Sequence, residues 1–293
     1  FAAEALGRTA HAPAVDGLIA LLESNDDEDA YIRHAASLAL SRIGDTEAVV
    51  ALHDHPSRAV RMGAVLALRR MSHEGITNFL DDKDEYIVTE AARAINDDFS
   101  IEPALPALGD VLNKPRFTQE PLIRRAINAN LRVGTEKAMQ NLISYALREN
   151  APTEMRAEAI AALGTWHKPS VLDRVTGRYR GPIERDPAEL RQNASDMLIQ
   201  LANHREKDLR LSAVNAIGRI NIEAGIPHLY ALLRNDRLPE VRIEALQSLA
   251  KMSDSGAGSP DIAKAIELAL ADREKSVRVS GLDLLAKTEL SEE

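Results

Sequence analysis

The hydrophobic positions along the chain follow a single recurring template. It reads aliphatic, Arg, two variable positions, small, two variable positions, small, aliphatic. The template occurs eight times, as IRHAASLAL (32–40), VRMGAVLAL (60–68), IVTEAARAI (87–95), IRRAINANL (123–131), MRAEAIAAL (155–163), LRLSAVNAI (209–217), VRIEALQSL (241–249) and VRVSGLDLL (277–285). Small residues three apart and aliphatic residues eight apart lie on one face of an α-helix. The template therefore predicts eight helices that each bury one face of aliphatic and small side chains.

Helices of a second kind are predicted between the template helices. Examples are AVDGLIALL (14–22), KAMQNLISYAL (137–147) and AGIPHLYALL (224–233). Each repeat is thus expected to be a hairpin in which helix A is followed by a template helix B. Prolines in first helical turns and glycines at helix ends support these boundaries. They are Pro152, Pro187, Pro239, Gly44, Gly134 and Gly164.

Most repeats are roughly 27 to 36 residues long, which is shorter than the ~40–47 residues of ordinary HEAT and armadillo units. The template and its spacing resemble the short HEAT repeats of the PBS-lyase type found in bacterial proteins. The resemblance implies an all-α fold, a right-handed α-solenoid of about eight stacked helical hairpins with one insertion, forming a single domain over residues 1–293. FAAEALGR matches the template from its fourth position, so we expect the chain to begin within a repeat at residues 1–9.

The second template position is arginine in seven of the eight copies, the exception being Val88. These template arginines are Arg33, Arg61, Arg124, Arg156, Arg210, Arg242 and Arg278. A guanidinium at the start of helix B can reach carbonyls or a carboxylate at the turn between the two helices, which predicts a structural role. Aspartates at such turns are Asp29, Asp84, Asp208 and Asp272. The alternative is an arginine ladder that binds a polyanion.

The net charge argues against that alternative. The chain has 36 Lys and Arg against 45 Asp and Glu, a charge of −9. Nucleic-acid binding rests on clustered positive charge, so we predict no nucleic-acid partner. The chain has no cysteine, which excludes disulfides, Cys-ligated zinc, iron–sulfur clusters and CxxCH haem within it. No apolar run approaches the roughly 18–20 residues that span a bilayer, so we predict no membrane span.

One interval between template arginines is too long for a repeat. Arg156 and Arg210 are 54 residues apart. Residues 187–203 form a plausible helix A, which leaves an insertion at about 166–186. Within it we predict a core role for Trp166, because it occupies the twelfth template position, and a short helix from Ser170 to Tyr179.

Long insertions in repeat proteins often carry function. This insertion has a charge of +2 within an acidic chain. It is therefore our candidate docking edge, whose residues are Arg174, Arg178, Tyr179, Arg180 and Arg185.

No catalytic motif is present. The chain contains no phosphate-binding loop, no dinucleotide fingerprint, no HExxH and no nucleophile elbow. His53-Asp54-His55 comes nearest to a metal cluster, and we expect it to be a solvated turn. Deoxyhypusine hydroxylase, a HEAT-repeat enzyme, holds two irons with His-Glu pairs at the start of helix B, but here the position reads His34-Ala35. We predict no catalytic residue, no metal and no cofactor.

The third and sixth template positions change along the chain from polar or basic to apolar. In the later copies they are Leu211, Val214, Ile243, Leu246, Val279 and Leu282. Two interpretations stay open here. An exposed apolar strip would mark a protein interface, whereas the same pattern also arises if each repeat is covered by the next.

Two functional hypotheses follow. The leading one is a non-enzymatic scaffold that binds a protein partner or flanking domains of its own polypeptide. The alternative is a small-ligand or enzymatic site at the insertion, with Asp173 and Arg178 as its polar groups, in a bilin-lyase-like or DNA-glycosylase-like protein.

GTWHKPSVLDRVTGRYR (164–180) also resembles the HEAT region of bacterial membrane-bound-dehydrogenase-like proteins, in which a propeller precedes and a cytochrome c follows the repeats. That resemblance implies a scaffold between redox domains and an extracytoplasmic location.

Overall fold

The computed structural model describes residues 1–254 and 260–290, with side chains to residue 287. The predicted domain also contains residues 255–259 and 291–293, which lie outside this description. The chain divides into two compact units. Unit 1 comprises Phe1–Val133 with Val175–Arg178, and unit 2 comprises Gly134–Arg174 with Tyr179–Glu293. A single domain over the whole chain stays a prediction.

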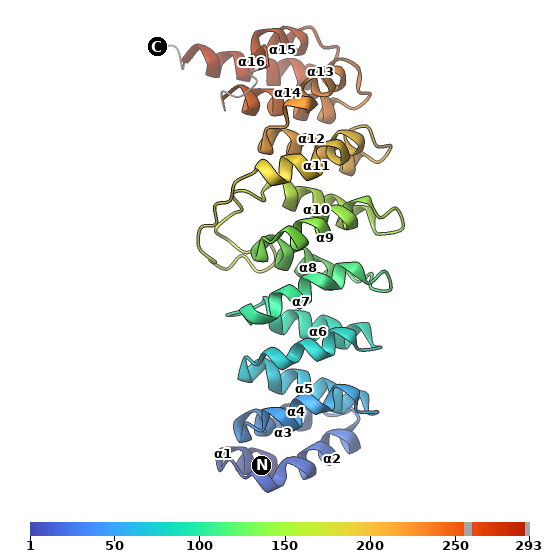
Figure 1. Ribbon diagram of the computed structural model, residues 1–293, viewed down its shortest axis with the longest axis vertical. Coiled ribbons are helices and arrows are strands. Elements are labelled where there is room, and N and C mark those ends of the chain that lie inside the picture. The colour runs from blue at the N-terminus through green and yellow to red at the C-terminus, as the bar shows by residue number, and fades with distance from the viewer. Residues whose placement is uncertain (255–259, 291–293) are drawn as a thin grey trace. The chain divides into compact units, whose positions relative to one another are not determined.

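Unit 1 is a succession of helical hairpins (Figure 1). Its template helices each pack on the next one, α3 on α5, α5 on α6 and α6 on α8. Its elements are α1 (Ala2–Arg8), η1 (Ala12–Ala14), α2 (Val15–Asn25), α3 (Ala30–Ile43), α4 (Thr46–Ala51), η2 (Leu52–Asp54), α5 (Arg58–Met71), η3 (Glu74–Asp81), α6 (Glu85–Asn96), η4 (Glu102–Ala104), α7 (Leu105–Asp110), η5 (Val111–Asn113) and α8 (Glu120–Val133).

Unit 2 repeats the arrangement, with α10 on α12, α12 on α14 and α14 on α16. Each of these template helices also packs on the helix that precedes it in the chain. The elements are α9 (Glu136–Leu147), α10 (Thr153–Gly164), α11 (Ala188–Leu201), α12 (Lys207–Ile220), η6 (Glu223–Gly225), α13 (Ile226–Asn235), α14 (Pro239–Asp254), α15 (Ile262–Leu270) and α16 (Lys275–Leu290).

The all-α solenoid predicted from the template is confirmed. Each of the eight template segments lies within one helix, and the described residues form no β-strand. The small eighth template position lets neighbouring helices approach closely, because it faces a glycine that directly follows the preceding template. A Cβ added to Gly164 would lie 3.0 Å from the Cα of Ala216, and one added to Gly218 would lie 2.7 Å from the Cα of Ser248. Small residues on both helices thus bring the two backbones together.

The open choice about the sixth template position is settled within the stacks. Val65, Val214 and Leu246 are each 0 % exposed, so the neighbouring repeat covers them and they form no surface strip. At Val214 and Leu246 the apolar residue therefore belongs to the core, whereas Leu282, at the same position of the last template copy, is 54 % exposed.

Two predictions about the insertion had different outcomes. Trp166 is 4 % exposed, which confirms that it continues the core of its repeat. The helix predicted from Ser170 to Tyr179 is wrong, because this segment consists of turns around an isolated antiparallel bridge between Leu172 and Tyr179. Gly177, with φ of +70°, occupies the left-handed region that a tight turn requires and a helix does not allow.

No helix among the described residues has the length and apolar content needed to cross a membrane.

Candidate docking site

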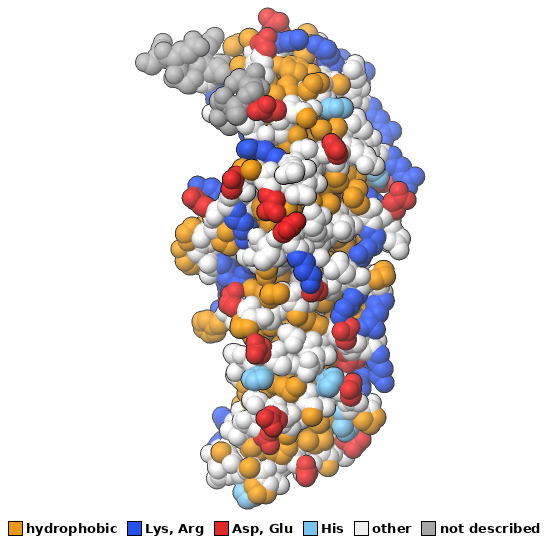
Figure 2. All heavy atoms as spheres, viewed as in Figure 1, with side chains coloured by type: hydrophobic (Ala, Val, Ile, Leu, Met, Phe, Trp, Pro, Cys, Tyr) orange, Lys and Arg blue, Asp and Glu red, His pale blue; other side chains and the backbone are white. Residues whose placement is uncertain are grey.

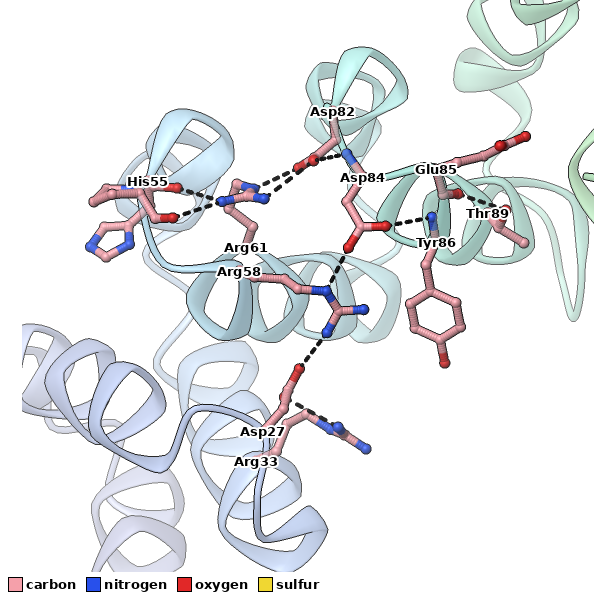
Figure 3. Close-up of polar contacts among 11 residues, drawn as sticks. Asp27, Arg33, His55, Arg58, Arg61, Asp82, Asp84, Glu85, Tyr86 and Thr89 are labelled. Carbon is pink, nitrogen blue, oxygen red and sulfur yellow. Dashed lines mark hydrogen bonds and ion pairs between the residues drawn. The ribbon is translucent and has the colours of Figure 1, made fainter. Parts of the chain in front are cut away.

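Arg61, the template arginine of α5, joins two turns (Figure 3). Its Nη1 donates to the carbonyls of His55 (2.8 Å) and Pro56 (3.1 Å), at the turn before its own helix. Its Nε and Nη2 donate to the two carboxylate oxygens of Asp82, at 2.7 and 3.3 Å. The side chains of Arg61 and Asp82 are only 4 % and 1 % exposed. This guanidinium therefore closes its own turn and ties it to the turn of the next repeat.

A similar arrangement recurs twice in unit 2, although the Nε and Nη2 of Arg210 make no hydrogen bond with the described residues. Arg210 donates to the carbonyl of His204 at 2.8 Å and pairs with Asp236 at 3.2 Å. Arg242 donates to the carbonyl of Asp236 at 2.8 Å and contacts both oxygens of Asp272 at 2.7 and 2.8 Å. In each case the carboxylate belongs to the turn of the following repeat.

Three of the expected turn aspartates do not serve this role. Asp29 and Asp84 cap the starts of their own helices, and Asp208 lies within the first turn of α12. The carboxylates that are used stand six positions before the second template position of the following repeat: Asp82, Asp236 and Asp272. That fixed offset is a sequence signal which the search for turn residues missed.

The other template arginines make different contacts. Arg33 pairs with Asp27 of its own turn at 3.1 Å, and Arg124 pairs with Glu120 one helical turn away at 2.6 Å. Arg156 is buried and donates through Nε to the carbonyl of Ala146 at 2.9 Å. Each of these three contacts lies within the arginine's own hairpin.

A second, more exposed network runs beside the buried pair in unit 1. Arg58 contacts Asp27 at 3.1 Å and Asp84 at 2.5 Å, and its guanidinium lies 5.4 Å from the centre of the Tyr86 ring. Burial alone raises the pKa of the Asp84 carboxyl, but hydrogen bonds from Arg58 and from the Tyr86 amide together with the Arg58 charge lower it. Because the Arg58 side chain is 45 % exposed, solvent screening keeps this network weak.

The His53-Asp54-His55 turn brings only two of its candidate ligands together, since the Nε2 of His53 lies 3.1 Å from the Asp54 carboxylate. The Nδ1 of His53 lies 3.1 Å from the Val50 carbonyl oxygen, and its ring packs edge-on against Phe79. The Nδ1 of His55 instead accepts a hydrogen bond from the backbone amide of Ser57. Within the described part of the chain, no group of three potential metal ligands comes together.

The insertion is braced from inside by its charged residues. The Asp173 carboxylate is 0 % exposed and pairs with Arg180 at 3.2 Å. Arg174 reaches Glu158 of α10 at 2.8 Å. Three of the candidate docking arginines thus have internal partners, because Arg185 too donates to the carbonyl of Trp166 at 2.9 Å and lies 4.8 Å from the centre of its ring. Burial lowers the pKa of Arg185.

The remaining two candidates are more exposed. Arg178, which clusters with unit 1, lies 3.5 Å from Asp98 of that unit and 5.8 Å from the centre of the Phe99 ring. Its side chain is 50 % exposed. Tyr179, in unit 2, is 70 % exposed.

The bridge in the insertion carries two exposed apolar side chains. Residues directly opposite each other in an antiparallel bridge share a face, and alternate residues point the other way. Leu172 and Tyr179 are opposite each other and are 49 % and 70 % exposed, whereas the buried Asp173–Arg180 pair occupies the alternate positions. We call Leu172 and Tyr179 the apolar pair. Figure 2 shows hydrophobic side chains exposed over this part of the chain.

Sequence reasoning found Tyr179 but missed Leu172. Residues 171–174 read VLDR, two apolar residues followed by two charged ones, so no alternation in the sequence marks a segment with two different faces.

Comparison with known proteins supports the repeat assignment. Residues 195–286 match the family model for HEAT repeats, and residues 32–55 match the model for the PBS lyase HEAT-like repeat. The chain therefore carries HEAT-type repeats. No curated protein matches it. Among solved structures, the crystal structure of an engineered protein is similar, with 18 % identity and a TM-score of 0.49, covering 97 % of this chain and 83 % of that one.

Proposed function

We propose that this chain is a non-enzymatic scaffold that docks a protein partner through the apolar pair of its insertion. The observation that carries the proposal is the exposure of Leu172 and Tyr179, 49 % and 70 %, on one face of a segment whose other face is anchored to the protein. Exposed apolar side chains that lie together commonly mark interaction sites, and tyrosine is enriched among the residues that dominate binding energy.

The insertion is suited to docking because it is fixed before a partner arrives. The bridge itself is held by a hydrogen bond from the Arg180 amide to the Val171 carbonyl at 2.7 Å. Beneath it, Arg180 also holds the buried Asp173 carboxylate. A surface that is already ordered loses little conformational entropy when it binds, which favours affinity.

The candidate arginines then have two different roles. Arg174, Arg180 and Arg185 hold the insertion in place through their internal contacts. A partner would touch Tyr179 and Leu172 directly, with the half-exposed Arg178 close to them in sequence. The centre of the proposed docking surface is accordingly apolar. The arginines noted in the sequence hold the segment that carries it in place.

The test compares three forms of the chain. Leu172→Ser with Tyr179→Ser removes the apolar pair, and Tyr31→Ser is the matched control because Tyr31 is 88 % exposed and belongs to α3 of unit 1 rather than to the insertion. A partner enriched from cells of the source by the unaltered chain is purified, and its dissociation constant is measured by titration calorimetry. Two lost hot-spot side chains should weaken binding by about 100-fold or more, while the control binds normally.

Equal binding by the double variant and the unaltered chain would refute the proposal. The melting temperature of the double variant serves as the folding check. Because both side chains are exposed, it should stay within about 2 °C of that of the unaltered chain.

The alternative hypothesis is a ligand or catalytic site at the insertion, with Asp173 and Arg178 as its polar groups. The Asp173 carboxylate is buried and already paired with Arg180, so it is not presented to a ligand. No observation on the chain favours this alternative over docking.

We also propose, from the resemblance of residues 164–180 alone, that the scaffold works beside redox domains outside the cytoplasm. The sequence of the complete gene product tests this directly. A flanking propeller and cytochrome c would support it, and a gene product that lacks both would refute it.

A further inference from the structure

A polar groove lies between the turn before α12 and the turn before α14, within unit 2. Its volume is about 510 Å³, and clefts of this size commonly bind small molecules. Its charged lining consists of the buried side chains of Arg210 and Asp236 and the exposed side chains of Arg205 and Arg237. Because three of these four groups are arginines, the groove has an excess of positive charge.

Arg210 is less completely bonded than the other two arginines that join repeats. In Arg61 and Arg242, the Nε and Nη2 of one guanidinium edge both donate to the two oxygens of an aspartate. The Nε of Arg210 lies 3.2 Å from Asp236, but neither its Nε nor its Nη2 forms a hydrogen bond with any described residue. One oxygen of Asp236 accepts from the Leu238 amide instead. Both nitrogens of Arg210 are buried, and a buried donor without an acceptor is unfavourable.

The two exposed arginines of the groove are only weakly held. The Arg205 side chain is 87 % exposed, and its 3.4 Å contact with Glu206 is a surface ion pair that contributes little. Arg237 makes no hydrogen bond or ion pair with the described residues. Both side chains can therefore rearrange around a ligand that enters the groove. Figure 2 shows Lys and Arg side chains along the right-hand edge over this part of the chain.

We propose that this groove is a binding site for a carboxylate group, carried by a small molecule or by an acidic peptide side chain. A carboxylate has two acceptor oxygens that match the two donors on one edge of a guanidinium, as Asp82 does at Arg61 and Asp272 at Arg242. The ligand supplies the acceptors that Arg210 lacks. The exposed arginines attract its charge and hold it.

The corresponding grooves at the other two junctions each lack one of these features. The groove at Arg242, of about 420 Å³, also has two exposed arginines, Arg234 and Arg273, but the edge of Arg242 is already filled by Asp272. The groove at Arg61 is lined by three aspartates against one arginine and one lysine. The groove at Arg242 is therefore the matched control, because its exposed charge is the same.

No residue of the groove belongs to the insertion, so failure of this inference would leave the proposed role of Leu172 and Tyr179 untouched, and the reverse also holds.

The test titrates the chain by calorimetry with succinate and, separately, with a short polyglutamate peptide whose ends are blocked. Sodium chloride at the same ionic strength controls for general screening. The proposal predicts saturable binding with a dissociation constant of about 1 mM or below, and the probe that binds more tightly identifies the source of the carboxylate. Absence of saturable binding by both probes would overturn the proposal.

Two substitutions distinguish this groove from the control groove. Arg237→Gln and Arg273→Gln each remove one exposed arginine, so both variants should fold and both lose the same charge. Arg237→Gln should weaken binding about tenfold or more, because a charge-assisted hydrogen bond is lost. Arg273→Gln should weaken it less than about twofold. Equal weakening by the two would show a general attraction to positive charge and would overturn the proposal.

Nuclear magnetic resonance of the unaltered chain reports the contact at Arg210. The Nε–H signal of Arg210 should shift in proportion to saturation with the more tightly binding probe. The Nε–H signal of Arg242 should stay in place, because Asp272 already accepts from it at 2.7 Å. An Arg210 signal that does not move at saturation would contradict the assignment, since the ligand would then lie elsewhere.

Discussion

The pair formed by Arg242 and Asp272 offers the sharpest test of how the repeats are held together. Replacing Asp272 by asparagine keeps the size of the side chain and an oxygen that can accept from the Glu274 amide, as the carboxylate does at 2.8 Å. What is lost is the negative charge that lies 2.7 and 2.8 Å from the Arg242 guanidinium.

Burial sets the size of the effect. The side chains of Arg242 and Asp272 are 2 % and 8 % exposed. Removing one partner of a buried ion pair leaves an uncompensated charge and costs about 3–5 kcal/mol. In a repeat protein each unit contacts mainly its neighbours, so the loss should concentrate in the α15–α16 hairpin that Asp272 joins to α14. The local opening equilibrium should rise by about two to four powers of ten, at about 1.4 kcal/mol for each.

Hydrogen exchange followed by mass spectrometry measures that opening in peptides covering residues 262–287. The matched control is Asp84→Asn, because Asp84 also caps its helix, accepting from the Tyr86 amide at 2.9 Å. Its partner Arg58 is 45 % exposed, so the control should cost about 1 kcal/mol or less. Equal acceleration of exchange around the two sites would refute the claim that burial makes the repeat-joining pairs strong.

The same pair should respond to acid. Burial alone raises the pKa of the Asp272 carboxyl, but hydrogen bonds from Arg242 and from the Glu274 amide, with the Arg242 charge, bring it below its ordinary value. A carboxyl whose pKa is lower in the folded state stabilises the fold above its unfolded pKa of about 3.9. That stabilisation is lost as the pH falls through the folded pKa. The hairpin of the unaltered chain should therefore loosen below about pH 4, and Asp272→Asn should reduce this dependence.

Three further substitutions test local packing. Gly134 and Gly177 have similar positive φ values of +67° and +70°, but a Cβ at Gly134 would lie 2.2 Å from the Arg185 side chain whereas one at Gly177 meets nothing within 4 Å. Gly134→Ala should therefore lower the free energy of unfolding by about 1 kcal/mol or more beyond Gly177→Ala, as read from urea denaturation; equal losses would contradict the Arg185 contact. Tyr145 is 1 % exposed, its hydroxyl has no hydrogen-bond partner among the described residues, and burial raises its pKa to about 12. Tyr145→Phe should leave stability unchanged or raise it by up to about 1 kcal/mol, and a loss above about 1 kcal/mol would indicate a bond to the hydroxyl.

The helices could be predicted from the sequence because their signal is repeated. Aliphatic residues eight apart, with small residues between them, leave one buried face, and eight copies of that pattern overrule local ambiguity. The cores of the stacks follow from the same positions, and even Trp166 could be placed because the template extends to it. Because the same helical preference recurs in eight segments, the fold could be predicted although each local preference is weak.

The insertion could not be predicted in the same way, since it occurs once. Its conformation depends on contacts distant in sequence, such as Arg174 with Glu158 and Arg185 with the carbonyl of Trp166. Charged residues there appeared available for a partner because their internal partners cannot be seen in the sequence. Of the aspartates that join the repeats, Asp272 was expected from the sequence, but Asp82 and Asp236 were missed, because their offset of six residues becomes meaningful only after one Arg–Asp pair has been seen.

The proposed docking surface is tested most directly by hydroxyl-radical footprinting of the chain with and without its purified partner. Tyr179 and Tyr31 are 70 % and 88 % exposed, so both should be oxidised readily in the free chain. Docking through the apolar pair predicts that the partner slows the oxidation of Tyr179 several-fold and leaves Tyr31 unchanged. A complex in which Tyr179 is oxidised as fast as in the free chain would contradict the central claim.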